Sequence, residues 1–241
     1  MRHNMFNPNK YTTMKTKIFN VMILDKSGSM SSIARQAVTG VNETLASIRS
    51  QQLKNPEQDN YVTLVAFCGC ELKTIYDQVP IAEVKDLTDR DYRPCCMTPL
   101  YDAIGTTITR IHQLASAEDT AVAVTIITDG YENASREYSH QAIQSLIGTY
   151  KEEGWMFAYI GADHDVEAVA YSLHIDNAMQ FDKTEEGTQK MFKRNRAARQ
   201  AWGSRVMACM AEPCASLDEK RSRLKDASAG FFSKGNEDDD A

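Results

Sequence analysis

Three short segments of the chain carry carboxylates and hydroxyls that could bind one metal ion together. Asp25-Lys26-Ser27-Gly28-Ser29 directly follows an apolar run and supplies one carboxylate and two hydroxyls. Thr98 lies in the segment Cys96-Met97-Thr98-Pro99-Leu100, and Asp129 follows the apolar run 121–127. Oxygen ligands of this kind suit Mg²⁺ or Mn²⁺ and offer nothing to a soft metal. The sequence therefore predicts a hard-cation site formed by five side chains: Asp25, Ser27, Ser29, Thr98 and Asp129.

Turn chemistry offers a simpler explanation for each segment taken alone. Asp, Ser and Gly are common in turns and at helix N-caps after a strand, and a Thr before Pro at a helix start needs no metal. Thr98 could therefore be only a cap. All three segments, however, occur together in one chain, and each follows an apolar run or opens a predicted helix. This combination of motif and context favours the metal site.

The order Asp-x-Ser-x-Ser, a distant Thr and a distant Asp resembles the metal ion-dependent adhesion site of the von Willebrand factor type A (VWA) family. The resemblance covers residues 17–202. It implies that the hydroxyls of Ser27, Ser29 and Thr98 hold the cation, while Asp25 and Asp129 bind directly or through water. It also implies an open coordination position for an Asp or Glu of a partner protein. Bacterial VWA proteins of stress responses such as tellurite resistance, and partners of AAA+ ATPases, are similar.

The apolar pattern predicts an α/β fold. Buried strands are expected at 17–24, 61–67, 121–127, 155–160 and 178–181, and helices at 33–53, 99–114, 139–150 and 185–202. The alternating segment 72–76 suits an antiparallel edge strand. We expect a doubly wound, mostly parallel six-stranded sheet with one antiparallel edge strand and helices on both faces, a VWA or Rossmann-like arrangement. Ligands of such sheets bind beyond the carboxyl ends of the strands.

The chain is predicted to contain one main domain with two flanking segments. Residues 1–16 form an N-terminal arm, residues 17–202 the VWA domain, and residues 203–241 a C-terminal extension with an acidic tail. The tail 235–241, with Phe231-Phe232 before it as an apolar anchor, could place a carboxylate in the metal site, but the composition favours a solubilising end.

Composition excludes several classes of function. The 241 residues are 42% hydrophobic and 25% charged, which is ordinary for a globular protein, and the net charge of −6 argues against a nucleic-acid partner. The basic run 190–196 is best explained as a solvated helix face. No segment reaches the roughly 18 apolar residues of a membrane span, and no secretory signal is visible, so we expect a cytoplasmic protein without a membrane partner.

Six cysteines offer a second possible ligand set, at positions 68, 70, 95, 96, 209 and 214. None has Cys-x-x-Cys spacing, so a zinc site using Cys68, Cys70 and Cys95 or Cys96 is disfavoured, and reduced thiols are expected in the cytoplasm. His164 could be a further metal ligand, although an exposed loop histidine is the simpler interpretation.

An enzyme is the alternative to a binding protein. Asp25 at a strand end could be the nucleophile of a metal-dependent phosphatase or phosphotransferase, similar to haloacid dehalogenase enzymes. Those enzymes need a general acid two residues later, and Ser27 stands at that position. Walker-type and Gly-x-Ser-x-Gly motifs are also absent. We therefore expect no catalytic residues and no enzymatic activity.

Overall fold

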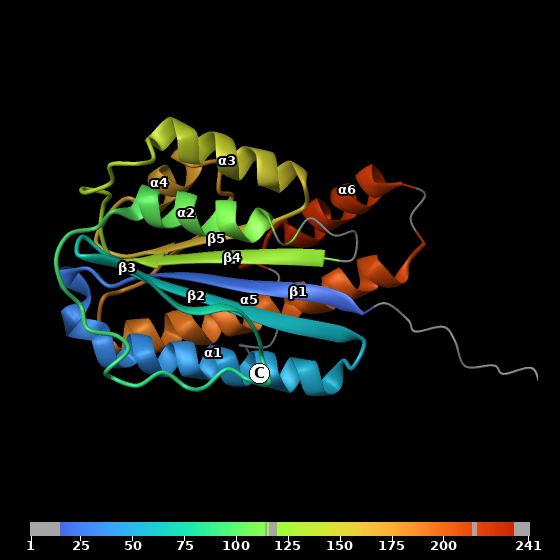
Figure 1. The fold of residues 1–241 in the computed structure, drawn as a ribbon, viewed down its shortest axis with the longest axis horizontal. Coiled ribbons are helices and arrows are strands. Elements are labelled where there is room, and N and C mark those ends of the chain that lie inside the picture. Colours follow the sequence, from blue (N-terminus) through green and yellow to red (C-terminus); the bar gives the residue numbers. More distant parts are fainter. Residues whose placement is uncertain (1–14, 114, 116–119, 214–215, 234–241) are drawn as a thin grey trace, which may run out of the picture.

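The computed structural model describes residues 15–113, 115, 120–213 and 216–233, arranged around one six-stranded sheet (Figure 1). The strand order is β3-β2-β1-β4-β5-β6, and only β3 runs antiparallel to its neighbour among the described strands. The strands are β1 Thr16–Asp25, β2 Gln58–Cys68, β3 Glu71–Pro80, β4 Thr120–Thr128, β5 Met156–Gly161 and β6 Asn177–Gln180. The predicted fold, including the antiparallel edge strand, is confirmed.

Strand β1 is central because both of its faces are apolar. Ile18, Met22 and Leu24 point into the core on one side of the sheet. Phe19, Val21 and Ile23 point into the core on the other side. Alternating residues of a strand face opposite sides, so a strand that is buried on both faces reads as one continuous apolar run.

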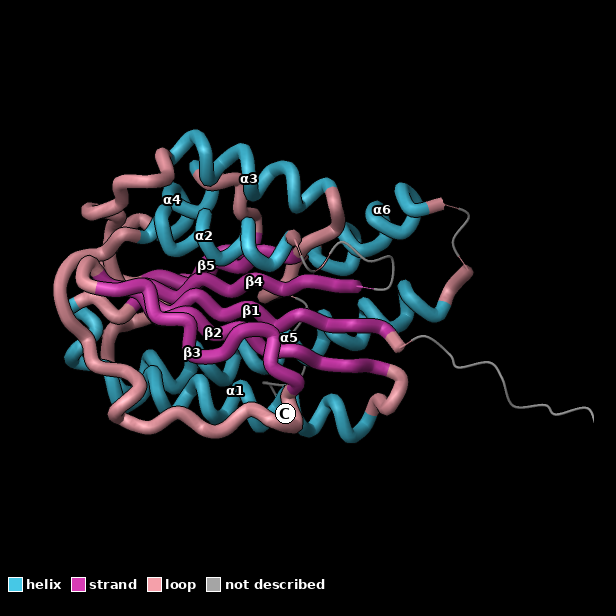
Figure 2. Tube along the Cα trace, in the orientation of Figure 1, coloured by secondary structure: helices cyan, strands magenta, loops and turns pink. Residues whose placement is uncertain are grey.

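Helices cover both faces of the sheet, as Figure 2 shows. On one face lie α1 (Ala34–Lys54) and α5 (Glu185–Ala211), which pack against each other. On the other face lie α2 (Leu100–His112), α3 (His140–Glu152) and α4 (Val166–Ser172). A short 3₁₀ helix, η1 (Gly28–Ile33), connects β1 to α1. Within the described residues, no helix has both the length and the apolar character to cross a membrane.

Arg199 of α5 fixes the two strands that lead to the predicted site. Its guanidinium is buried and donates hydrogen bonds to Asn20 Oδ1 of β1 at 3.0 Å and to Thr125 Oγ1 of β4 at 2.7 Å. The charged guanidinium is thus bound by neutral acceptors on two adjacent strands, and these hydrogen bonds connect α5 to β1 and β4.

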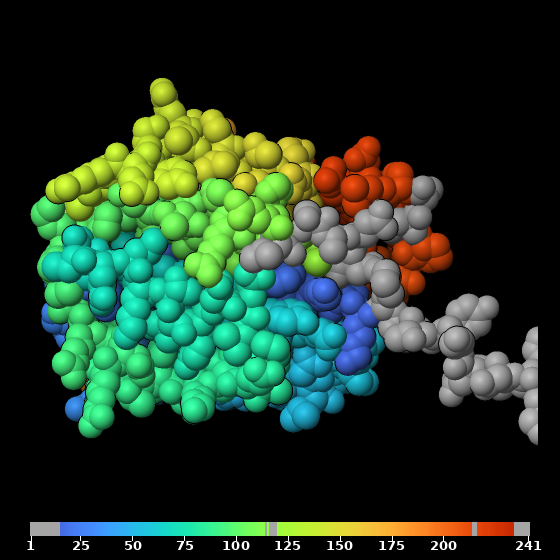
Figure 3. Space-filling model, viewed as in Figure 1, coloured from blue at the N-terminus to red at the C-terminus, as the bar shows by residue number. Residues whose placement is uncertain are grey.

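The C-terminal part of the chain is more ordered than its sequence predicts. Helix α5 was expected to end at Trp202, but it continues to Ala211, so the predicted boundary between residues 202 and 203 falls inside a helix. A further helix, α6 (Leu217–Ser228), lies at the amino ends of the parallel strands (Figure 1), and Figure 3 shows this C-terminal part in red at the right of the molecule. Phe231 and Phe232 belong to the core and are not part of a mobile tail. The tail 235–241 lies outside the described residues.

Candidate metal site

The carboxyl ends of β1 and β4 bring the predicted ligands together. These strands are parallel neighbours, with Leu24 opposite Ile127, so Asp25 at the end of β1 lies beside the end of β4. Asp129 follows β4 directly, and Ser27 and Ser29 lie in the turn that leads into η1. Side chains 100 residues apart therefore share one edge of the sheet.

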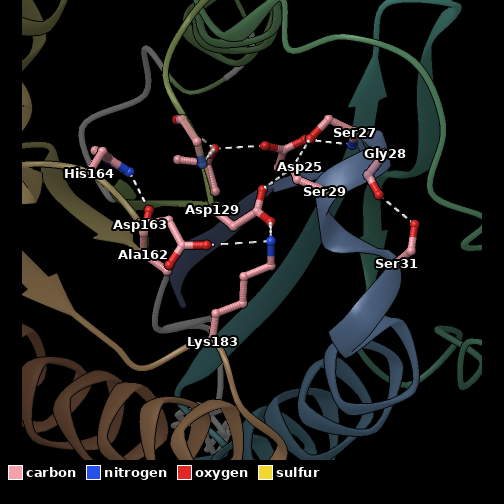
Figure 4. A network of polar contacts seen from close by, with 12 residues as sticks. Asp25, Ser27, Gly28, Ser29, Ser31, Asp129, Ala162, Asp163, His164 and Lys183 are labelled. Atoms are coloured by element: carbon pink, nitrogen blue, oxygen red, sulfur yellow. Dashed lines mark hydrogen bonds and ion pairs between the residues drawn. The ribbon is translucent and has the colours of Figure 1, made fainter.

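Four of the five predicted ligands form one hydrogen-bonded network (Figure 4). The Ser29 hydroxyl donates to Asp129 Oδ1 at 2.6 Å, and the Ser27 and Ser29 hydroxyl oxygens lie 3.1 Å apart. The Ser27 backbone N–H donates to Asp25 Oδ1 at 2.6 Å. Ser29 is exposed, whereas the other three are buried, so the network opens to solvent at Ser29.

Asp25 is the most buried member of the network. Its carboxyl group has no solvent-exposed surface, and Oδ2 accepts a hydrogen bond of 2.7 Å from the Thr128 hydroxyl. Burial raises the pKa of Asp25 to about 6, although the hydrogen bonds from Thr128 and Ser27 work in the opposite direction. At neutral pH the group is therefore ionised, at a cost in stability that a nearby cation would offset.

Thr98, the fifth predicted ligand, is held by Asn133 and not by the hydrogen bonds of this network. Its N–H donates to Asn133 Oδ1 at 2.8 Å, and its carbonyl accepts from the Asn133 N–H at 3.1 Å. The N-cap of α2 is Pro99, so the expected capping role of Thr98 is wrong. Among the described residues, no hydrogen bond involves the Thr98 hydroxyl. The Thr98 backbone is therefore fixed by Asn133, and its hydroxyl is available to bind a cation.

Lys183 is the residue that sequence reasoning missed. It follows β6, and its ammonium nitrogen lies 2.6 Å from Asp129 Oδ2 and 3.5 Å from Asp163 Oδ2 (Figure 4). Asp129 Oδ2 is buried and forms an ion pair with this ammonium, but the geometry of the contact does not meet the criteria for a hydrogen bond. Burial works to lower the pKa of Lys183, but the two carboxylates outweigh it and raise the pKa.

Solved structures of other proteins match the fold of this chain, whereas no protein-family model and no curated protein matches the sequence. The D319A mutant of the PilB minor pilin from Streptococcus sanguinis gives a TM-score of 0.55 at 13% identity, over 77% of this chain and 62% of the pilin. The vWF domain of the type V pili tip protein Mfa5 from Porphyromonas gingivalis gives 0.51 at 11% identity, over 74% and 95%. The SpRpn10 VWA domain gives 0.52 at 9% identity, over 74% and 94%.

This chain has a VWA-like fold. The identities are all below 25%, so the likeness concerns the fold and leaves the function to the residues of the site. The matched part spans less than two thirds of the pilin. Within the VWA-like sheet, the network of Asp25, Ser27, Ser29 and Asp129 lies where ligands of open α/β sheets bind.

The residues present fit a hard divalent cation. Every donor in the network is a carboxylate or hydroxyl oxygen, and Asp129 Oδ2 is a buried atom without a hydrogen-bond partner among the described residues. A buried oxygen of this kind needs a cationic partner, which Lys183 now provides. The uncommitted Thr98 hydroxyl is a further donor of the same class.

Two other expectations near the VWA-like site are wrong. His164 is buried, not exposed, because its ring nitrogens contact the Tyr159 hydroxyl, at 3.1 Å, and the Ala162 carbonyl. Both nitrogens are engaged, so His164 has no free ligand atom. The cysteines were expected to be reduced, but Cys70 and Cys96 form a disulfide because the β2–β3 turn meets the loop before α2. Cys214 lies outside the described residues.

Proposed function

We propose that this protein is a metal-dependent protein-binding module. Asp25, Ser27, Ser29, Thr98 and Asp129 would hold Mg²⁺ or Mn²⁺, and the bound cation would supply positive charge to an Asp or Glu side chain of a partner protein. The observation that carries the proposal is the convergence of hard oxygens on a buried, cation-paired Asp129 at the carboxyl edge of the sheet.

The composition of the ligand set supports capture of a carboxylate. Three of the five ligands are neutral hydroxyls, which bind a hard cation without cancelling its charge. Ser29 lies at the exposed side of the network, where an incoming side chain can approach from solvent. The bound cation would therefore keep part of its positive charge, which would attract the partner's carboxylate.

Lys183 would set the affinity of this site for the cation. Its ammonium and a divalent cation compete for the same Asp129 oxygen. Asp163, whose side chain is 60% exposed, offers Lys183 an alternative partner on the solvent side. Lys183 would turn toward Asp163 when the site is loaded, so the metal-free protein keeps its Asp129 charge neutralised.

We favour binding over catalysis by Asp25 because Ser27 stands two residues later, where a phosphatase of the haloacid dehalogenase type needs its general acid. Following the resemblance in the sequence, we propose a cytoplasmic setting in which the partner belongs to a bacterial stress-response or AAA+ ATPase-linked assembly.

Calorimetric titration with Mn²⁺ tests the metal site. Asp25→Ala/Asp129→Ala should lose measurable binding, whereas Asp218→Ala, which removes an exposed carboxylate on the distant α6, should bind like the parent. Equal affinity of the double variant and the parent would contradict the proposal. A pull-down from the source cells with and without Mg²⁺ then tests the partner, with Asp129→Ala as the control bait.

A further inference from the structure

Four cysteines from two distant segments meet at the edge of the sheet. Cys68 and Cys70 flank the turn between β2 and β3, and Cys95 and Cys96 lie in the loop before α2. Cys70 and Cys96 form the disulfide, and the Cys68 and Cys95 sulfurs lie 3.2 Å apart. The sulfurs of Cys68, Cys70 and Cys95 all lie within 4.8 Å of one another.

Backbone hydrogen bonds hold the two segments together independently of the sulfur atoms. The Gly69 N–H donates to the Met97 carbonyl at 2.7 Å, between the two cysteines of the turn. The Cys95 N–H donates to the Lys26 carbonyl at 2.9 Å, and the Cys96 carbonyl accepts from the Gly28 N–H at 3.0 Å. Reduction of the disulfide would therefore leave all four thiols gathered.

The left-handed backbone of Cys96 explains how two adjacent residues face the same turn. Successive side chains of an extended segment point to opposite sides. Cys96 has a φ of 61°, which breaks that alternation, so Cys95 reaches Cys68 while Cys96 reaches Cys70. Because non-glycine residues adopt this conformation only where the surroundings hold it, it indicates a built arrangement.

We propose that Cys68, Cys70, Cys95 and Cys96, once the disulfide is reduced, form a four-thiolate site for Zn²⁺. Zinc binds thiolates at about 2.3 Å in a tetrahedron, which places the sulfurs roughly 3.8 Å apart. The Cys68 and Cys95 sulfurs are 3.2 Å apart, and the sulfurs of Cys68, Cys70 and Cys95 all lie within 4.8 Å of one another, so the thiols would need only small movements to surround one ion. The Cys-x-Cys and Cys-Cys spacings differ from common zinc motifs because each pair comes from a tight backbone turn.

Neighbouring groups suit a negatively charged zinc-thiolate centre. The buried Lys26 lies between Asp25 and Ser27 and pairs with Glu71, the residue after Cys70, so an ammonium with its carboxylate partner stands beside the cluster. An open groove of about 490 Å³, lined in part by Cys68, Cys70 and Cys96, gives an ion access from solvent.

Formation of the zinc site would need two steps, reduction of the Cys70–Cys96 disulfide and exchange of thiol protons for zinc. A dithiol reductant donates two electrons and two protons to the Cys70–Cys96 bond and itself becomes a disulfide. Zinc then replaces the protons of the four thiols, which are released to solvent. The proposal is independent of the oxygen ligands, so it stands or fails separately from the proposed function.

The test uses the full chain, reduced under anaerobic conditions, with Zn²⁺ and Co²⁺ as probes. We expect one retained zinc per chain after desalting, and thiolate-to-cobalt charge-transfer bands in the near ultraviolet. Cys68→Ser/Cys95→Ser should lower zinc affinity by about 100-fold or more. Cys209→Ser, which removes a cysteine outside the cluster, should behave like the parent.

Two results would overturn the proposal. One is retention of equal zinc by the parent and by Cys68→Ser/Cys95→Ser. The other is a cobalt spectrum without thiolate bands, which would place the ion on oxygen ligands. Repeating the titration in Asp25→Ala/Asp129→Ala removes the oxygen site from the measurement. Circular dichroism of each variant separates lost ligands from lost folding, and thiol counting of the reduced parent confirms that all four sulfurs were available.

Discussion

Two clusters of opposite chemistry lie near the short loop 95–98, which supplies Cys95 and Cys96 to one of them. The oxygen cluster (Asp25, Ser27, Ser29 and Asp129) stands at the centre of the sheet, where β1 and β4 end. The sulfur cluster (Cys68, Cys70, Cys95 and Cys96) stands at the β2–β3 edge. An ammonium pairs with a carboxylate in the first cluster, and a covalent bond joins two sulfurs in the second, each at a place where we propose a metal ion.

The Lys183 ammonium and the Cys70–Cys96 disulfide would be displaced in different ways, so metal binding by the two clusters would depend on different conditions. Lys183 would leave the oxygen cluster by rotating its side chain toward Asp163, so occupancy of the proposed site would depend on the concentration of a competing cation. The disulfide leaves the sulfur cluster only by reduction, so occupancy there depends on redox conditions. Thr98 lies two residues after Cys96, so one predicted oxygen ligand and two of the cysteines share a loop.

The largest expected effect is a crossed loss of metal binding. Asp129→Ala should lower Mn²⁺ affinity by about 100-fold or more and leave zinc binding by the reduced protein unchanged. Cys68→Ser/Cys95→Ser should do the reverse. Calorimetry for Mn²⁺ and retained zinc after desalting measure both. If either variant loses both metals while remaining folded, the two clusters are one site and the comparison fails.

The second expected effect concerns the stability of the metal-free protein. Asp25→Asn keeps an acceptor for the Ser27 N–H but has no charge to bury. Because burial raises the Asp25 pKa to about 6, from an ordinary value of about 4, the native state holds this proton more tightly than the unfolded state does. The contribution of Asp25 to stability therefore declines as pH rises from about 4 through about 6.

Above about pH 6 that cost is fully present, so at neutral pH Asp25→Asn should be more stable than the parent by on the order of 2 kcal/mol. The gain should vanish near pH 4, and Mn²⁺ should not stabilise the variant. Chemical denaturation in EDTA at several pH values measures this. Asp91→Asn, a surface carboxyl whose pKa is lowered by its hydrogen bonds with Thr88, should show no gain at neutral pH.

The fold and most of the oxygen cluster could be predicted because their signals are local. A strand buried on both faces is a continuous apolar run, and residues that follow such strands must meet at one edge of a parallel sheet. Asp25, Ser27, Ser29 and Asp129 meet there as predicted. The coordination of a metal by these residues and Thr98 stays a prediction.

Other features could not be predicted because they depend on contacts between distant segments. A single lysine after a short edge strand gives no sign that Lys183 reaches Asp129. The sulfur cluster requires the turn of one hairpin to meet a loop through backbone hydrogen bonds. The extra length of α5 rests on sparse apolar residues such as Val206, which a periodic pattern does not reveal.

The third expected effect is a gain in affinity. Lys183→Met removes the competing ammonium but keeps an apolar side chain of similar length, so Mn²⁺ should bind about 10-fold more tightly. Lys190→Met, which removes an exposed lysine paired with Glu186, is the matched control and should not change the affinity. Weaker binding by Lys183→Met in calorimetry would mean that Lys183 assists the site instead of competing for it.

The smallest expected effect tests the link between the two clusters at Thr98. Thr98→Val keeps the shape of the side chain and the backbone hydrogen bonds with Asn133 but removes the uncommitted hydroxyl. If that hydroxyl is a ligand, Mn²⁺ affinity should fall by roughly 5-fold, and Thr98→Ser should restore it. Because Pro99 is the N-cap of α2, stability in EDTA should not fall by the roughly 1 kcal/mol that loss of a capping hydroxyl costs. A drop in stability with unchanged Mn²⁺ affinity would instead assign Thr98 a purely structural role and leave the oxygen cluster with four ligands.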